Sequence, residues 1–223
     1  MTLATTLLVA SLLAAPPDAA TAAPATAAPA VPPPITLLGA GALGPGGAAV
    51  MGEVGFPYLQ VTYAQSVGPW DDLGMVAGAD WTTGEILLAF LWRRELAGDA
   101  GSRAGFRLVV GPSFNFGATW DYPGNQPNLG LLLAPGVAWT ASVARGLLSV
   151  GLDLGMEWAM QRGQGFAVQP RLGLSYEAPV GKELTVGARA GVAARWGWGS
   201  AHVPGMDDRL LGAFTAMITW RIF

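Results

Sequence analysis

The sequence predicts an all-β fold, an antiparallel up-and-down transmembrane β-barrel of eight to ten strands, with ten favoured. Long segments alternate apolar and polar residues, which indicates strands because successive side chains point to opposite faces. Charged residues are only 12% of the 223 residues and hydrophobic residues are 52%, whereas about 25% charged residues is usual for soluble domains. Short and long connections also follow each other in turn, as expected for short turns at one end of a barrel and long loops at the other.

The segment 148–161 shows the alternation most clearly. Its first face is entirely apolar and carries Leu148, Val150, Leu152, Leu154, Met156, Trp158 and Met160. Its second face holds Asp153 and Glu157 among small and polar residues. A strand of this length with an unbroken apolar face fits a barrel wall that touches lipid and encloses a polar lumen. A soluble ligand-binding barrel, the main alternative, would have the opposite polarity.

The same pattern predicts strands at 106–120, 129–141, 166–177, 184–197 and 210–223. Toward the N-terminus, residues 72–81 alternate clearly, 86–94 are apolar on both faces, and 58–65 are short and mixed. Residues 35–43 and 48–56 form a possible first hairpin. The count is ten if residues 48–65 are one strand broken by Pro57, and eight is the alternative, since single-chain bacterial barrels have even strand numbers.

The connections assign a direction to the strands. Residues 144–146 and 178–182 form short connections, whereas 122–128 and 198–208 are longer and rich in Gly, Pro, Asn and Asp. Short turns are periplasmic and long loops extracellular in this architecture. Residues 96–105 do not fit, because this expected periplasmic turn is long.

Three prolines also conflict with the predicted strands. Pro112, Pro135 and Pro170 each fall inside one of them, and a closed barrel has no edge where the missing N–H of proline is harmless. Bulges or a shifted register are expected at these positions.

The N-terminal segment has the features of export. The apolar run 3–15 and the small residues near 20–23 predict a signal peptide over residues 1–23. No Lys or Arg precedes the run, so the signal is atypical or the true start lies upstream. Residues 24–34 are an Ala/Pro-rich segment expected to be a disordered linker. The barrel is expected over residues 35–223.

Aromatic residues cluster near the ends of the predicted strands. Barrels carry aromatic belts at both lipid–water boundaries, where amphipathic rings are most stable. The residues predicted to form these belts are Trp81, Trp92, Trp120, Trp139, Trp158, Tyr176, Trp196 and Trp220.

In these patterns the chain resembles a small bacterial outer-membrane β-barrel protein, over about residues 35–223 and without a specific subfamily. The resemblance implies a monomer in the outer membrane of a Gram-negative cell envelope, surrounded by the lipid bilayer and inserted by the outer-membrane assembly machinery. The terminal Phe223, with Trp220 and Ile222, would form the assembly signal. The chain departs from the family's pattern at Arg221 and Thr219, where apolar residues are usual.

Charged residues are expected to line the lumen as a ladder of ion pairs. The six carboxylates and six arginines predicted to point inward are Asp72, Asp80, Glu85, Asp153, Glu157, Glu177, Arg93, Arg107, Arg171, Arg189, Arg195 and Arg221. Such charges should pair, because an uncompensated buried charge costs several kcal/mol, an order-of-magnitude figure. Glu157, Arg171 and Arg189 come from consecutive strands and are candidates for direct pairing. A lumen plugged by such pairs predicts a structural or surface-interaction role, and the alternative is a narrow conduit for small polar solutes.

Other kinds of chemistry have little support. The chain contains no Cys and one His, so neither a transition-metal site nor a cofactor is expected. The net charge of −3 without a basic cluster argues against nucleic acid. His202, in a predicted outer loop near Ser200, Asp207 and Asp208, is a weak catalytic candidate for a lipid-active hydrolase. We expect a solvated loop residue instead, and no enzyme.

Overall fold

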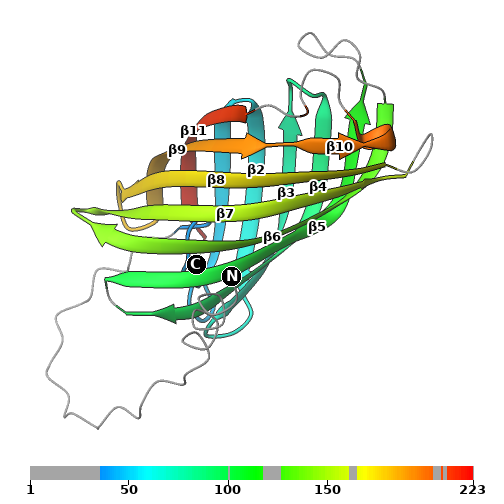
Figure 1. Cartoon of the computed structure of the whole chain (residues 1–223). Helices are drawn as coiled ribbons and strands as arrows, with labels where there is room; N and C mark the ends of the chain where they lie inside the picture. Colours follow the sequence, from blue (N-terminus) through cyan, green and yellow to red (C-terminus); the bar gives the residue numbers. More distant parts are fainter. Residues whose placement is uncertain are drawn as a thin grey trace, which may run out of the picture. The chain divides into compact units, whose positions relative to one another are not determined.

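The computed structural model describes residues 36–99, 101–117, 127–160, 165–202, 207 and 210–222. Within these residues the protein is one antiparallel sheet that closes on itself, with a single 3-10 turn, η1 (Gly199–Ala201) (Figure 1). The predicted signal peptide and linker lie outside the described residues and stay predictions. Among the described residues, no helix has the length and apolar character needed to cross a membrane.

The strand segments follow one another along the chain. They are β1 (Ala48–Phe56), β2 (Tyr58–Ser66), β3 (Asp71–Asp80), β4 (Glu85–Gly98), β5 (Ser102–Phe116), β6 (Pro127–Val143), β7 (Gly146–Ala159), β8 (Gly165–Pro179), β9 (Leu184–Ala194), β10 (Trp196–Trp198) and β11 (Leu210–Arg221).

The barrel closes because each strand pairs with its neighbours in the chain and β11 pairs with β1. From β1 to β8 every strand lies next to the following one, β8 pairs with β9, and β9 pairs with β11. The short β10 pairs with β8 in the same register as β9, after an interruption at Arg195. Since β9 and β10 are one interrupted strand, the eleven segments make a barrel of ten strands. The predicted fold class and favoured strand count are confirmed.

The start of the barrel differs from the expected one. Residues 36–47 contain no strand, so the predicted hairpin of 35–43 with 48–56 is wrong. β1 and β2 are instead two separate strands that pair with each other around Pro57. Ten is therefore the right count for a different reason: the expected strand at 35–43 is absent, and residues 48–66 form two strands where one was expected.

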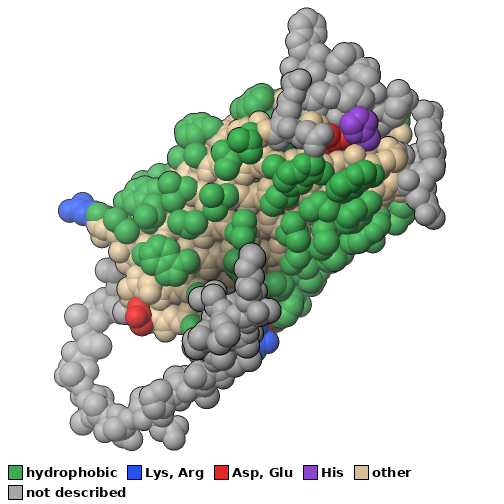
Figure 2. All heavy atoms as spheres, viewed as in Figure 1, with side chains coloured by type: hydrophobic (Ala, Val, Ile, Leu, Met, Phe, Trp, Pro, Cys, Tyr) green, Lys and Arg blue, Asp and Glu red, His purple; other side chains and the backbone are tan. Residues whose placement is uncertain are grey.

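The polarity of the wall is that of a membrane barrel. Leu152, Leu174 and Val192 are 52%, 50% and 51% exposed on the outside. Asp153 lies next to Leu152 in the sequence but points inward and is buried. Figure 2 shows hydrophobic side chains spread over the barrel surface, while the charged side chains visible in this view lie toward its ends. A soluble barrel would expose the charges and bury the leucines.

The connection between β4 and β5 is short, although the sequence suggested a long one. Both strands extend into it, with a register shift between Glu95 and Ala97. The Asp99 carboxylate accepts the amides of Gly101 and Ser102, both at 2.7 Å, and closes the turn. The backbone amides of Ser102 and Gly101 lower the pKa of Asp99 below its ordinary value. The connection is therefore a short turn, like the others at the end of the barrel where β1 begins and β11 ends.

The three prolines interrupt pairing with only one neighbour each. Pro112 keeps its partner on β6, Pro135 its partner on β5, and Pro170 its partner on β7. Gaps in pairing occur on the other side, between β5 and β4, β6 and β7, and β8 and β9. The N–H and C=O of a residue in an antiparallel strand point to the same neighbour, so a proline removes bonds on one side only. The third gap is the interruption between β9 and β10.

Candidate functional site: the barrel lumen

The lumen holds an inner plug, a central charge cluster and an outer chamber. We call the end where β1 begins and β11 ends the inner end. The inner plug is the segment 36–43, which enters the barrel before β1 begins. The central charge cluster consists of Glu53, Arg107, Asp153 and Arg189. The outer chamber is a cavity at the opposite end.

Arg93 holds the backbone of the inner plug. Its Nη2 donates to the carbonyl oxygens of Thr36, Gly39 and Gly41 at 3.0, 3.3 and 2.7 Å. Its Nη1 lies 3.5 Å from Asp72 Oδ2, and both side chains are buried. One arginine of β4 therefore ties three carbonyl groups of an otherwise irregular backbone to the wall.

Hydroxyl and carboxyl groups of other strands complete the attachment. Thr36 Oγ1 donates to Glu177 Oε1 at 2.5 Å, and the amide of Ala40 donates to Thr140 Oγ1 at 2.7 Å. A Cβ added at Gly39 would lie 2.2 Å from Thr140 Oγ1, so only glycine fits this closely against the wall. The plug is thus bound to β4, β6 and β8.

Apolar packing seals the plug toward the middle of the barrel. Leu37 is 2% exposed and, with Leu38, belongs to one buried cluster with Met51, Val76 and Leu91. Burial of this apolar surface stabilises the inserted segment. The inner half of the lumen therefore has a core of its own.

The central charge cluster crosses the lumen. Arg107 binds Asp153 with two donors, one of them Nε at 2.6 Å from Oδ1. Arg189 lies 3.7 Å from Glu53 Oε1 and 4.0 Å from Asp153 Oδ2. Thr215 donates to Glu53 at 2.5 Å. Two-donor arginine–carboxylate pairs are strong and fixed in geometry, so this layer is rigid.

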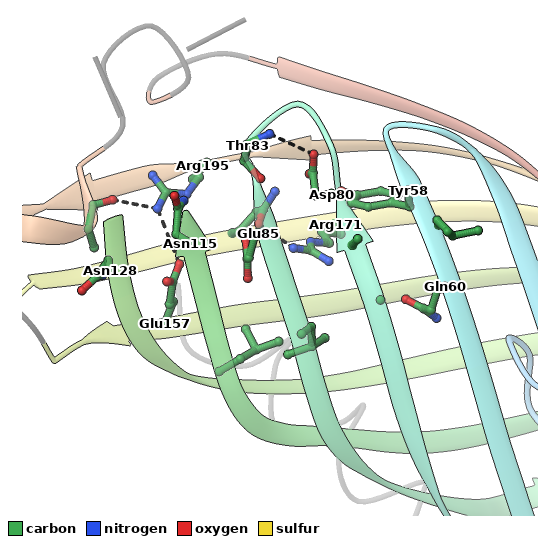
Figure 3. Close-up of a pocket in the computed structure, with 17 residues that line it drawn as sticks. Tyr58, Gln60, Asp80, Thr83, Glu85, Asn115, Asn128, Glu157, Arg171 and Arg195 are labelled. Atoms are coloured by element: carbon green, nitrogen blue, oxygen red, sulfur yellow. Dashed lines mark hydrogen bonds and ion pairs between the residues drawn. The ribbon is translucent and has the colours of Figure 1, made fainter. Parts of the chain in front are cut away.

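The outer chamber is a polar cavity of about 70 Å³ formed by the outer ends of β2 to β8 (Figure 3). Arg195 lies across it, 3.6 Å from Glu157 Oε2, and donates to the carbonyl of Ala201 at 2.7 Å. The polar residues labelled around it in Figure 3 are Tyr58, Gln60, Asp80, Thr83, Glu85, Asn115, Asn128, Glu157, Arg171 and Arg195.

The expected ladder of Glu157, Arg171 and Arg189 does not form. Glu157 pairs with Arg195, and Arg189 pairs with Glu53 and Asp153. Arg171 has no carboxylate within 4.0 Å among the described residues. Facing positions on neighbouring strands gave the wrong partners, because these long side chains reach past the neighbouring strand to the next strand along the wall.

The other predicted lumen residues separate by depth. The plug is contacted by Asp72, Arg93 and Glu177. The central charge cluster contains Arg107, Asp153 and Arg189. The outer chamber is lined by Asp80, Glu85, Glu157, Arg171 and Arg195, and the inner end of β11 carries Arg221.

Sequence reasoning missed Glu53 and Glu95, which pair with Arg189 and Arg103. Alternation over residues 48–56 would have found Glu53, since Met51 and Glu53 are buried on one face and Val54 is exposed on the other.

The predicted belt and assembly residues are partly described. Trp120 and Phe223 lie outside the described residues. Large exposed faces are found at Trp81, Trp139, Trp158, Tyr176, Trp196, Trp220 and Ile222. Trp92 donates its indole N–H to Asp71 at 3.0 Å and packs edge-on against Phe106. Their roles at the membrane boundary and in assembly stay predictions.

His202 lies at the outer rim with a carboxylate partner. Its Nδ1 is 2.5 Å from Oδ2 of Asp207. The other carboxylate oxygen of Asp207, Oδ1, lies 2.5 Å from Nη1 of Arg195. The imidazole is 52% exposed. A catalytic base also needs a nucleophile within hydrogen-bond reach, and among the residues with described side chains none contacts the ring. Likewise, no cluster of three or more metal-binding side chains occurs in the described part of the chain.

The wall decides which class of protein this is. A closed sheet leaves no unpaired backbone edge, and an apolar outside around a charged inside is stable only where hydrocarbon surrounds it. The protein is an outer-membrane β-barrel. No protein-family model matches the chain, and no curated protein matches it.

Solved structures show weak likenesses. The barrel is similar to outer-membrane expressed OmpT of Vibrio cholerae, at 15% identity and a TM-score of 0.33, over 74% of this chain and only 56% of that one. CarO of Acinetobacter baumannii is 13% identical with a TM-score of 0.27, over 79% of this chain and 97% of CarO. CarO2 of the same organism is 11% identical with a TM-score of 0.28, over 78% of this chain and 98% of CarO2. At these scores the assignment rests on the barrel's own geometry.

Proposed function

We propose that this outer-membrane barrel is closed to diffusion and acts as a structural or surface-interaction protein. The observation that supports this most is the inner plug, residues 36–43, bound within the wall by Arg93, Glu177 and Thr140. Because the plug is part of the chain itself, it occupies the lumen of every copy. In this proposal the protein is a monomer, since a closed sheet has no free edge to pair with another chain, and it is inserted by the outer-membrane assembly machinery.

The energetics support a closed resting state. Withdrawing the plug would take three backbone acceptors from Arg93 and the hydroxyl of Thr36 from Glu177. Each hydrogen bond to a charged group typically contributes about 1.5–3 kcal/mol. The cavities on either side of Arg171 along the axis, about 70 and 80 Å³, have room for only a few waters.

Conductance in planar bilayers tests this proposal. The full chain should give no steady open-channel current, because plug and charge cluster block the lumen in series. A variant lacking residues 36–43 should show at least brief openings, since only the central charge cluster remains. Retention of the heat-modifiable mobility of a folded barrel is the control for both proteins. Steady current through the full chain would contradict the proposal.

A narrow conduit for small polar solutes is the second candidate. It is favoured by the succession of cavities from the outer rim to the plug, which meet at Arg171. In this case the plug would have to move to open the inner end, and the full chain would conduct. We assign no catalysis to the pair of His202 and Asp207.

A further inference from the structure

Arg171 of β8 lies where three cavities of the lumen meet. It lines the outer chamber of about 70 Å³, a middle cavity of about 80 Å³ above the plug, and a third cavity of about 270 Å³ beside β9 and β11. We call the third one the rim cavity. It reaches the outer end of the barrel, since Pro57 and Thr82, from the turns there, line it.

The guanidinium of Arg171 is only partly used. Its Nη2 donates to Gln169 Oε1 at 2.6 Å, and its Cζ lies 6.0 Å from the centre of the Tyr58 ring. Its Nε is buried and has no hydrogen-bond partner. By contrast, Arg107 and Arg195 each have a carboxylate within ion-pairing distance. Arg171 therefore has donors left for a ligand.

The nearby carboxylates are engaged elsewhere or out of reach. Asp80 accepts the amide and hydroxyl of Thr82 at 2.9 and 2.7 Å and the amide of Thr83 at 3.1 Å. Asp153 accepts both donors of Arg107. Figure 3 shows Arg171 beside Tyr58 and Asp80, below the turn that holds Asp80. An incoming anion would therefore add to the contacts of Arg171 without displacing a bound carboxylate.

The side of the rim cavity formed by the outer ends of β9 and β11 is apolar. Gly191, Ala193, Leu211 and Ala213 line it, all at inward positions of β9 and β11. Three of these four positions carry Gly or Ala, which leaves space inside the wall. The cavity thus has an apolar side and a charged side, on which Arg171 lies with Asp80 and Arg189.

We propose that the rim cavity binds a small organic carboxylate with a compact apolar body. Its carboxylate would accept the free donors of Arg171 beside Tyr58, since arginine presents a fork that matches a carboxylate. Its body would lie against Ala213 and Leu211. A volume of about 270 Å³ suits a molecule of the size of benzoate. The inference deepens the surface-interaction role proposed above and rests on it.

Fluorine NMR on the full chain in detergent micelles tests this ligand class. The probes are 4-fluorobenzoate, 4-fluorobenzylamine and 4-fluorobenzyl alcohol, which share a ring and differ in charge, with the signal change in empty micelles subtracted. Fluorobenzoate should bind at least ten-fold more tightly than the other two. Equal binding of the amine or the alcohol would overturn the proposal.

Two variants locate the site. Arg171→Gln should weaken fluorobenzoate binding at least ten-fold, because it removes the charge, and Ala213→Leu should do the same by filling the apolar side. Arg145→Gln, in the turn at the inner end, removes an equal charge and should leave binding unchanged. Heat-modifiable mobility shows which variants fold, and if Arg171→Gln does not fold, Ala213→Leu decides alone. Unchanged binding in the folded variants would overturn the proposal.

Failure of the binding proposal can be distinguished from failure of the proposed function. A channel current together with intact, Arg171-dependent binding contradicts the closed lumen and keeps the binding site. A closed barrel without fluorobenzoate binding contradicts the binding site and keeps the closed lumen.

Discussion

At the scale of single residues, neighbouring arginines of β4 have opposite environments. Arg93 points inward and is buried against Asp72 and the plug, whereas Arg94 points outward, is 50% exposed and lies 3.9 Å from Asp71. The difference follows from the two-residue period of a strand. The two adjacent arginines therefore allow a buried ion pair to be compared with an exposed one.

We predict that Arg93→Met lowers the free energy of unfolding by about 3–5 kcal/mol, because Asp72 is left buried without its counterion. The amides of residues 36–43 should also exchange faster with solvent. The matched control is Arg94→Met, which should cost less than about 1 kcal/mol because exposed ion pairs contribute little. Denaturant unfolding and hydrogen exchange measure both effects. Equal losses in the two variants would show that Arg93 does not hold the plug.

At the scale of elements, proline positions explain where the sheet is interrupted. Pro170 pairs with Leu154 of β7 on one side, and on the other side faces the gap between β9 and β10. A proline has no N–H for that neighbour. The gap leaves Arg195 outside both strands, with its side chain directed to Glu157.

We predict that Pro170→Val joins β9 and β10 into one continuous strand, because valine restores the missing donor. Amides around Arg195 should then exchange more slowly with solvent, as measured by hydrogen exchange with mass spectrometry. Leu154→Val, at the paired position on β7, is the control for a change of side-chain shape at this depth. Unchanged exchange around Arg195 would mean that the interruption has another cause.

At the scale of the whole molecule, stability depends on hydrocarbon outside and charge inside. Leu152 and Asp153 are adjacent in the middle of β7, yet the first is exposed on the wall and the second is buried in the lumen. An ionised group on the wall would replace apolar contact with lipid by a poorly solvated charge.

We predict that Leu152→Arg destabilises the barrel in lipid vesicles by about 2–4 kcal/mol, the range for Arg at the middle of the bilayer. Leu152→Met, which keeps the face apolar, should change stability by less than about 1.5 kcal/mol. Reversible unfolding in vesicles measures both. A tolerated arginine at this position would contradict contact with lipid.

Much of the wall could be predicted from the sequence, and little of the lumen. The face of each residue in β5 to β8 follows from alternation, because period two is a local property of an extended chain. The partners of Arg189 and Glu157 do not follow, because each long side chain reaches past the neighbouring strand to a partner two strands away. The expected strand at 35–43 was wrong for a related reason: its apolar residues are buried inside the barrel, a place that exists only once the sheet has closed.

The sequence by itself determined that most of these strands are long, which side of them is apolar, and that such a wall suits a membrane. Only the tertiary structure decided that the chain plugs its own lumen and that Arg171 has no carboxylate partner among the described residues. Thr36 and Glu177 are 141 positions apart, and closure of the barrel brings them together. Local periodicity carries no information about which distant groups will share an enclosed space of fixed width.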